Sequence, residues 1–232
     1  MILSKGFNGK TRLNLPHREK RRLLAAMLLD IHGQLERSGR FDRIIVATPD
    51  IEVVDFCRAR GFSCVNTDPR DINGALREVQ ALARREGCEF LLVTASDLPF
   101  FSAELVEALM ARLEGLVGAH GLGAVFCPSR NLGLTVCAAS PPGSVGLSVD
   151  DRTPNLLRLD RVAGPTPRAL EPRFEAFLDI DSDADLAETY RLMAEMPRLQ
   201  SSLLYRFLES YFEGAASVPA GGCDSGSTGG TG

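Results

Sequence analysis

The sequence lacks the features of several protein classes. Its six cysteines are scattered singly without a C-x-x-C pair, which argues against zinc sites and thioredoxin-type chemistry. No apolar run approaches the length of a membrane span, and the N-terminus lacks the apolar segment and cleavage site of a signal peptide. The net charge of -4 gives no support for nucleic-acid binding. We therefore expect a cytoplasmic protein with free thiols that binds neither nucleic acid nor membrane.

Nucleophilic catalysis also has little support. The chain has three histidines, and none of them is accompanied by a matching serine or cysteine motif. His17, His32 and His120 all fall in predicted helices or loops. Any chemistry is therefore expected from carboxylates and basic side chains.

Helical and strand-like patterns alternate along most of the chain, which predicts βαβ units in an α/β domain with a mostly parallel sheet flanked by helices. The predicted helices are 16–38, 51–60, 73–87, 102–116, 182–195 and 199–212. Ser182 with Asp185 resembles a capping box for the helix at 182–195. The predicted strands are 43–49, 62–66, 90–93, 124–128, 134–138 and 174–180, with a stub at 1–3. We expect one domain over residues 1–213, a long loop over 140–173 and a disordered Gly/Ser-rich tail over 214–232.

The run Phe90-Leu-Leu-Val93 reads as a strand buried on both faces, and Asp97 follows it directly. Pro99 stops the strand, so Asp97 is expected at the carboxyl end of a central strand, where α/β sheets bind ligands. The alternative is that Asp97 caps the next helix. Ser102 already supplies that cap, which favours a functional role for Asp97.

The segment from Ser4 to Leu13 brings Lys5, Lys10 and Arg12 together with two glycines. One interpretation is a solvated basic N-terminus. The other is a phosphate cradle made of backbone N–H groups and cationic side chains, as triphosphates require. The Gly-Lys-Thr of this segment lacks the spacing of a Walker loop.

Four segments occur in the order found in one known family. They are Lys5 with Lys10-Thr-Arg-Leu13, Ile72-Asn-Gly-Ala75, Ser96-Asp-Leu-Pro99, and Asp179-Ile-Asp181 with Asp185-Leu186. The chain resembles, over roughly residues 1–195, the 2-phospho-L-lactate guanylyltransferase family of coenzyme F-420 biosynthesis. The resemblance implies a single-domain, Rossmann-like nucleotidyltransferase fold of the glycosyltransferase-A type.

The resemblance also implies an activity: transfer of GMP from GTP to a small phosphorylated acid, with release of pyrophosphate. The acid would be 2-phospho-L-lactate, phosphoenolpyruvate or 3-phosphoglycerate, and the cofactor Mg²⁺. The implied residues are Lys5, Lys10, Arg12 and Asp97 for catalysis, Gly6, Gly9, Asn73 and Ser96 for the nucleotide, Gly133, Thr135 and Ser148 for the acceptor, and Asp97, Asp179 and Asp181 for the metal. Asn73 has a second interpretation as a helix cap.

The residues fit this chemistry independently of the resemblance. An acceptor phosphate is already ionised, so positioning and charge neutralisation suffice without a strong base. Magnesium is typically held by one or two carboxylates plus phosphates, and Asp179 and Asp181, two apart on an extended backbone, point to one side.

The chain departs from the family at several points. The first strand is shorter, so the N-terminus looks truncated. The family's Gly-Thr-Asn-Ala turn appears as Gly133-Leu-Thr-Val136, and its Gly-Ser-Phe segment is echoed only by Gly146-Leu-Ser148. These changes put the identity of the acceptor in question.

The alternatives left open are another nucleotidyltransferase or a sugar-nucleotide glycosyltransferase of this fold, or a catalytically degenerate scaffold. The apolar face of the last helix either packs on the body or forms a homodimer contact.

Overall fold

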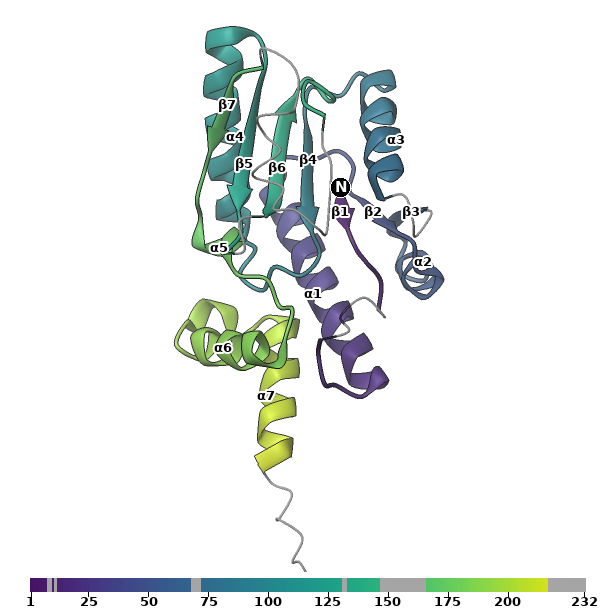
Figure 1. Cartoon of the computed structure of the whole chain (residues 1–232), viewed down its shortest axis with the longest axis vertical. Helices are drawn as coiled ribbons and strands as arrows, with labels where there is room; N and C mark the ends of the chain where they lie inside the picture. Colours follow the sequence, from purple (N-terminus) through teal and green to yellow (C-terminus); the bar gives the residue numbers. More distant parts are fainter. Residues whose placement is uncertain (8–9, 11, 68–71, 131–132, 147–165, 217–232) are drawn as a thin grey trace, which may run out of the picture.

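The computed structural model describes residues 1–7, 10, 12–67, 72–130, 133–146 and 166–216. Within this part of the chain, seven strands form one sheet in the order β3-β2-β1-β4-β6-β5-β7 (Figure 1). The strands are β1 (Ile2–Leu3), β2 (Ile45–Thr48), β3 (Ser63–Asn66), β4 (Leu91–Ala95), β5 (Gly123–Pro128), β6 (Leu134–Ser140) and β7 (Arg168–Leu170). The helices are α1 (His17–Ser38), α2 (Ile51–Arg58), α3 (Ile72–Arg85), α4 (Ala103–His120), α5 (Phe174–Phe177), α6 (Asp183–Ala194) and α7 (Leu203–Ala216), with a 3₁₀ turn η2 at Pro197–Leu199.

The sheet is mostly parallel, as predicted. β1 pairs in parallel with both β2 and β4, and β2 pairs in parallel with β3. β6 runs antiparallel to its neighbours β4 and β5, and β5 then pairs in parallel with β7. The short β1 therefore lies in the middle of the sheet, and the carboxyl ends of β1, β2 and β4 meet along one edge.

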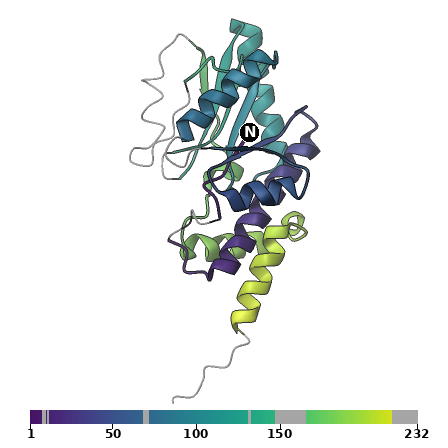
Figure 2. The ribbon, with the colours of Figure 1, turned by 90° about the vertical axis from the view of Figure 1, so that its right-hand side faces the viewer.

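Helices cover both faces of the sheet because alternate strand residues point to opposite sides. Ile2, Val46 and Leu92 pack with the apolar faces of α1 and α4, whereas Ala47 and Val93 pack against α3. Figure 2 shows α3 and α4 on opposite sides of the strands. This layered arrangement is the predicted α/β fold.

The prediction of a strand at 174–180 is wrong. The last strand is β7, inside the predicted long loop, and residues 174–177 form the short helix α5. The alternation of Ala176, Leu178 and Ile180 mimics a strand because all three side chains are buried. In the described part of the chain this segment forms no strand pairing, and its backbone is joined to its neighbours by single hydrogen bonds, such as Ile180 N to Asp97 O and Arg130 N to Phe177 O. The rest of the predicted loop, residues 147–165, lies outside the described residues.

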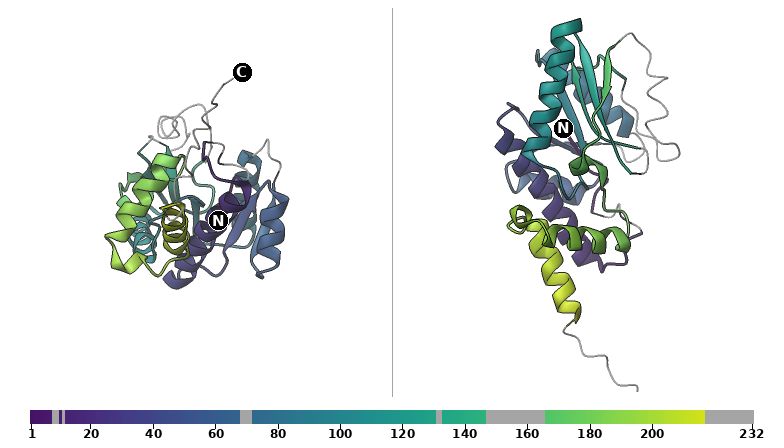
Figure 3. Two further views of the ribbon diagram at one scale, coloured as in Figure 1. Left: turned by 90° about the horizontal axis from the view of Figure 1, so that it is seen from below. Right: turned by 90° about the vertical axis from the view of Figure 1, so that its left-hand side faces the viewer.

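The C-terminal helices pack on the body of the protein. Backbone N–H groups of Leu203 and Leu204, at the start of α7, donate to the carboxylate of Asp30 in α1, at 3.0 Å and 2.8 Å. Tyr190 of α6 stacks on Phe212 of α7 with ring centroids 5.0 Å apart. The right-hand view of Figure 3 shows α7 beside α6, below the sheet. Packing on the body is thus the alternative that the structure shows for the last helix, and a homodimer contact stays a prediction.

The remaining sequence predictions concern thiols and membranes. Cys57, Cys127 and Cys137 are buried free thiols, Cys64 is half-buried and Cys88 is exposed. No helix among the described residues is both long and apolar enough to cross a membrane. The predicted tail lies outside the described residues from residue 217, and α7 continues to Ala216.

Candidate active site

Two chain segments leave the sheet side by side at its carboxyl edge. β1 is followed by the basic loop, residues 4–13, and β4 is followed by Ser96 and Asp97. In Figure 1 this edge faces α5 and α6. Ser102 caps α4 by accepting a hydrogen bond from Leu105 N at 3.1 Å, so Asp97 is not needed as the cap of that helix. The basic loop and Asp97 therefore lie where open α/β sheets bind ligands.

The Lys10 side chain lies between two carboxylates that come from distant parts of the chain. Its Nζ atom donates to Asp181 Oδ1 at 2.6 Å and to Asp97 Oδ2, and the residue is 8% exposed. Burial alone would lower the pKa of Lys10, but the charge of Asp97 and the contacts with Asp181 raise it above its ordinary value. The ammonium group therefore stays charged and joins the end of β4 to the segment before α6.

Two further cations act on Asp181. Arg12 Nη2 lies 3.3 Å from Asp181 Oδ2, and the Arg12 side chain is 75% exposed. Burial would raise the pKa of Asp181, but Lys10, Arg12 and Lys5 together lower it. In the part of the chain that the structure describes, the Arg12 fork contacts one carboxylate oxygen, and most of its side chain is accessible to a ligand.

Asp179 has the opposite electrostatic environment. Its Oδ1 atom is buried and finds no hydrogen-bond partner among the described residues. Burial, followed by the charges of Asp97 and Asp181, raises the pKa of Asp179. A buried oxygen without a partner is rare in native structures and calls for an explanation such as an ion or a proton.

A backbone hydrogen bond and a helix cap fix the segments that carry these carboxylates. Ile180 N donates to the carbonyl oxygen of Asp97 at 3.2 Å, which fastens the segment carrying Asp179 and Asp181 to the end of β4. Ser182 and Asp185 form the predicted capping box at the start of α6. Two local signals, a strand stop and a helix cap, place Asp97 and Asp181 at the ends of their own segments, and the bond between Ile180 and Asp97 joins the two segments.

Sequence reasoning missed Asp50, which shapes the basic loop. Asp50 caps α2 by accepting from Glu52 N at 2.9 Å, and its other oxygen accepts from Phe7 N at 2.8 Å. Gly6 has a φ of 94°, and a Cβ atom there would lie 2.5 Å from Asp50 Cβ. The signal that could have located Asp50 is its place directly after Thr48-Pro49, at the end of a predicted strand.

The structure distributes the other predicted residues as follows. Ser96 is half-buried between β4 and Asp97, and Asn73 lies in the first turn of α3. Gly133 N donates to Ser129 Oγ at 3.2 Å in the β5–β6 turn. The buried Thr135 hydroxyl donates to Ala176 O at 2.6 Å, and Cys127 O lies 3.3 Å from it. Gly9 and Ser148 lie outside the described residues.

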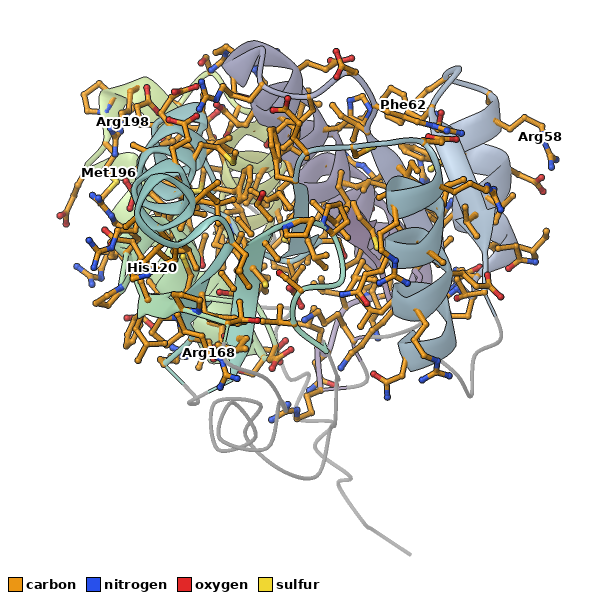
Figure 4. All side chains as sticks on the ribbon, turned by 90° about the horizontal axis from the view of Figure 1, so that it is seen from above. Arg58, Phe62, His120, Arg168, Met196 and Arg198 are labelled. Carbon is orange, nitrogen blue, oxygen red and sulfur yellow. The ribbon has the colours of Figure 1, made fainter. Side chains whose placement is uncertain are left out.

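Two of the histidines are placed away from the carboxylates. His32 stacks on Phe62 with ring centroids 3.7 Å apart and lies 3.5 Å from a Glu36 oxygen. His120 ends α4, roughly 27 Å along the helix from its start near Asp97. Figure 4 shows His120 and Phe62 well apart, on different sides of the molecule. Among the described interactions, neither histidine contacts Asp97, Asp179 or Asp181, so neither is a candidate acid or base of the cluster.

The cluster suits a divalent cation shared with a ligand. No three His, Cys, Asp or Glu side chains in the described part of the chain are close enough together to hold a metal ion by themselves. Magnesium needs fewer protein ligands when phosphate oxygens and water complete its octahedron. The partnerless Asp179 oxygen, with Asp97 and Asp181 nearby and Lys10 already between those two, fits such a site.

Comparison with known proteins decides the family. The family model described as the MobA-like NTP transferase domain matches residues 9–143, which is more than half of the chain. The chain belongs to this family. The match includes Lys10, Arg12 and Asp97 and ends before Asp179. This member of the MobA-like NTP transferase family is therefore an enzyme, a nucleotidyltransferase, as the sequence predicted.

Individual relatives agree with this assignment. The family member is 29% identical over 172 residues to a phosphoenolpyruvate guanylyltransferase of Sphaerobacter thermophilus, covering 73% of this chain and 80% of the relative. It is 32% identical over 111 residues to a 2-phospho-L-lactate guanylyltransferase of Methanothermobacter thermautotrophicus, covering 47% and 48% of the two chains. The predicted resemblance to this group of enzymes is confirmed.

Solved structures confirm the fold. A candidate nucleotide-diphospho-sugar transferase of Desulfovibrio desulfuricans G20 superposes with a TM-score of 0.67 at 17% identity, over 91% of this chain and 94% of that one. At this identity the likeness concerns the fold alone. It supports the predicted nucleotidyltransferase architecture for this member of the MobA-like NTP transferase family.

Proposed function

We propose that this enzyme is a guanylyltransferase that moves GMP from GTP to a small phosphorylated acid and releases pyrophosphate, in coenzyme F-420 biosynthesis. The observation that carries the proposal is the cluster at the carboxyl edge of the sheet, where Lys10 lies between Asp97 and Asp181. The choice of guanine and of the acceptor is supported by the names of two relatives, the phosphoenolpyruvate guanylyltransferase and the 2-phospho-L-lactate guanylyltransferase.

The basic side chains suit a triphosphate. Lys5, Lys10 and Arg12 follow β1, and the charges of all three reach Asp181. A bound triphosphate brings its own negative charge to this edge, and an accessible guanidinium can hold two phosphate oxygens at once. Arg12 and Lys10 would orient the β- and γ-phosphates and neutralise the pyrophosphate as it leaves.

The carboxylates suit the magnesium ion that such a triphosphate carries. Asp97, Asp179 and Asp181 would hold it, and the ion when bound supplies charge neutralisation at the transferring phosphoryl group. Lys10 Nζ lies between Asp97 and Asp181, so the lysine has to turn away from them when the ion enters. The triphosphate offers the displaced ammonium group a new anionic partner.

The reaction requires the protein mainly to position the acceptor and GTP. A phosphate oxygen of the acceptor attacks the α-phosphorus of GTP, and the bond from that phosphorus to the β-phosphate's bridging oxygen breaks. The acceptor oxygen is already ionised, so no residue has to remove a proton. This agrees with the positions of His32 and His120, which lie away from the cluster.

We propose phosphoenolpyruvate as a better acceptor than phospholactate. Leu134 stands where the resembling family has threonine, and a leucine side chain cannot donate to a phosphate or a carboxylate. Thr135 stands at the asparagine position, and its hydroxyl hydrogen is directed at Ala176 O. Phosphoenolpyruvate and phospholactate carry the same carboxylate and phosphate, so the preference between them is supported by the relative named phosphoenolpyruvate guanylyltransferase, which matches over more of both chains than the phospholactate enzyme does.

A pyrophosphate-release assay tests the proposal. Each of the four nucleoside triphosphates is combined with phosphoenolpyruvate, 2-phospho-L-lactate or 3-phosphoglycerate in the presence of Mg²⁺. We expect release only with GTP, fastest with phosphoenolpyruvate, and no release without an acceptor. The product should contain one guanosine and a new diphosphate bond, identified by mass spectrometry.

An Asp97→Asn variant is the control, because it loses the charge of the carboxylate and keeps its shape. Release with CTP and a sugar acid instead of GTP would show a cytidylyltransferase and contradict the guanylyl assignment. Absence of GTP binding by calorimetry in the presence of Mg²⁺ would contradict the proposed function altogether.

A further inference from the structure

The segment that carries two of the carboxylates has no regular secondary structure. We call residues 178–182 the carboxylate arm; it lies between α5 and α6 and contains Asp179 and Asp181. Among the described residues its backbone makes single hydrogen bonds, such as Ile180 N to Asp97 O at 3.2 Å and Leu186 N to Ser182 O, the first bond of α6, at 3.0 Å. Its position therefore depends on individual hydrogen bonds from its neighbours, and a displacement of about 1 Å at reacting groups can cost about 100-fold in rate.

The β5–β6 hairpin holds the N-terminal side of the arm. Arg130 N donates to Phe177 O at 3.0 Å, and the Thr135 hydroxyl donates to Ala176 O at 2.6 Å. Both acceptors belong to α5, directly before the arm. The hairpin thus holds the helix directly before the arm, and one of the two contacts comes from Thr135, which sequence reasoning associated with the acceptor.

The C-terminal side of the arm is held by one carboxylate. Asp185 Oδ2 accepts hydrogen bonds from Asp181 N at 2.9 Å, Ser182 N at 2.7 Å and Ser182 Oγ at 2.9 Å. Its other oxygen, Oδ1, accepts from Arg130 Nη2. The Asp185 side chain is 10% exposed, so its charge depends on these partners for compensation. One side chain therefore joins Arg130 to the backbone of Asp181.

We propose that Arg130 is a positioning residue, which fixes the carboxylate arm through Asp185 and so sets the metal-binding geometry of Asp179 and Asp181. Arg130 contacts both sides of the arm: its backbone N–H donates to Phe177 O before the arm, and its guanidinium donates to Asp185 after it. The inference rests on the proposed function, because it concerns the site that would hold the divalent ion. Outer partners that orient metal ligands commonly change metal affinity or activity by about 10- to 100-fold when they are lost.

The contacts of Arg130 argue against a direct contact with the acceptor. Its guanidinium is shared by Asp185 and Glu188, with Nη1 3.2 Å from Glu188 Oε2, and its side chain is 27% exposed. To bind a substrate it would have to leave Asp185 without its cation. The Arg12 side chain, by contrast, is 75% exposed, and its ion pair with Asp181 among the described residues, at 3.3 Å, is one that a phosphate can replace at little cost.

Direct measurement of Mn²⁺ binding tests this inference, with Mn²⁺ as the spectroscopic substitute for Mg²⁺. Titrations followed by electron paramagnetic resonance are made on wild type, Arg130→Met and Arg130→Lys, with and without a non-hydrolysable GTP analogue. We expect Arg130→Met to weaken Mn²⁺ binding about 10- to 100-fold. Arg130→Lys should restore part of the loss, because it keeps the charge and loses the fork. The KM for phosphoenolpyruvate should stay unchanged in both variants.

Two further variants separate positioning from other effects. Arg173→Met is the matched control, because Arg173 pairs only with Glu171 in the described contacts, at 2.8 Å, and should bind Mn²⁺ like wild type. Asp185→Asn should reproduce the Arg130→Met defect, and the double variant should add little to it. If Arg130→Met folds poorly, the comparison of Arg130→Lys with Asp185→Asn carries the test.

Three outcomes would overturn the inference. A raised KM for phosphoenolpyruvate with unchanged Mn²⁺ affinity would show that Arg130 binds the acceptor directly. Equal losses in the Arg130 and Arg173 variants would show a general loss of stability. If Arg130→Met binds Mn²⁺ as tightly as wild type, Arg130 does not position the metal ligands. If wild type binds no Mn²⁺ at all, the proposed metal site fails, which is a different result.

Discussion

Replacing Lys10 by methionine separates two roles of this side chain. The variant removes the ammonium group between Asp97 and Asp181 and retains an apolar side chain in a position that is 8% exposed. The lost cation competes with a divalent ion for the two carboxylates, and it is also the group expected to neutralise the triphosphate. We therefore predict opposite changes in two measured quantities: Mn²⁺ binds more tightly without nucleotide, while nucleotidyl transfer slows.

The magnitude follows from the charges and their exposure. Two unit charges about 4 Å apart interact by about 4 kcal/mol at an effective dielectric constant of about 20. The carboxylates of Asp97 and Asp181 are 20% and 28% exposed, so water takes over part of the lost interaction. A remaining effect of about 1.4 kcal/mol corresponds to about tenfold tighter Mn²⁺ binding. Loss of one preorganised cation at the transferring phosphate should lower kcat by about 100- to 1000-fold.

The assay measures Mn²⁺ binding by electron paramagnetic resonance in nucleotide-free protein, and kcat by pyrophosphate release. Lys20→Met is the control, because Lys20 lies in α1 outside the cluster and should change neither quantity. Unchanged or weaker Mn²⁺ binding in Lys10→Met would refute the competition between lysine and metal. An unchanged kcat would refute the role of Lys10 at the triphosphate.

Four other substitutions test single contacts. Asp97→Asn should lower kcat by about 100-fold or more with an unchanged melting temperature, since it removes charge and keeps shape; a loss of stability in proportion to activity would mark a structural residue. Arg12→Ala should raise the KM for GTP about tenfold, and an unchanged affinity in calorimetry would favour a solvated basic terminus. Gly6→Ala should lower the free energy of unfolding in urea by about 2 kcal/mol or more, exceeding Gly39→Ala, which shares a positive φ but has open space around its Cβ position. Thr135→Val should cost about 1–3 kcal/mol by leaving a buried carbonyl unpaired, and no change would show that water replaces the hydroxyl.

The sequence by itself determined most of the helices and strands. α1 and α4 follow apolar positions at helical spacing, and these side chains are buried in the structure. The capping box of Ser182 and Asp185 predicted where α6 begins, because capping hydrogen bonds join residues three apart. The strand stop at Pro99 likewise placed Asp97 at the carboxyl end of β4. These are local effects, in which the residues that decide the outcome are close together in the chain.

Some local patterns were ambiguous without the rest of the protein. The alternating apolar residues at 174–180 predicted a strand, yet the same burial is achieved by α5 and an irregular segment. β7 was missed because its three residues take their pairing from β5, more than forty positions earlier in the chain. Alternation records which side chains are buried, whereas strand formation also requires backbone pairing with a neighbouring strand.

Only the tertiary structure decided how the candidate site is assembled. Lys10 is 87 positions from Asp97 and 171 from Asp181, and no local pattern predicts that its ammonium group lies between them. The contacts of Asp50 with the basic loop and of Arg130 with Asp185 are also between distant residues. The sequence identified the charged groups because strand ends and helix caps depend on residues that are close together in the chain. The sheet topology decided which of these groups meet, because it sets the distances between segments that are far apart in the chain.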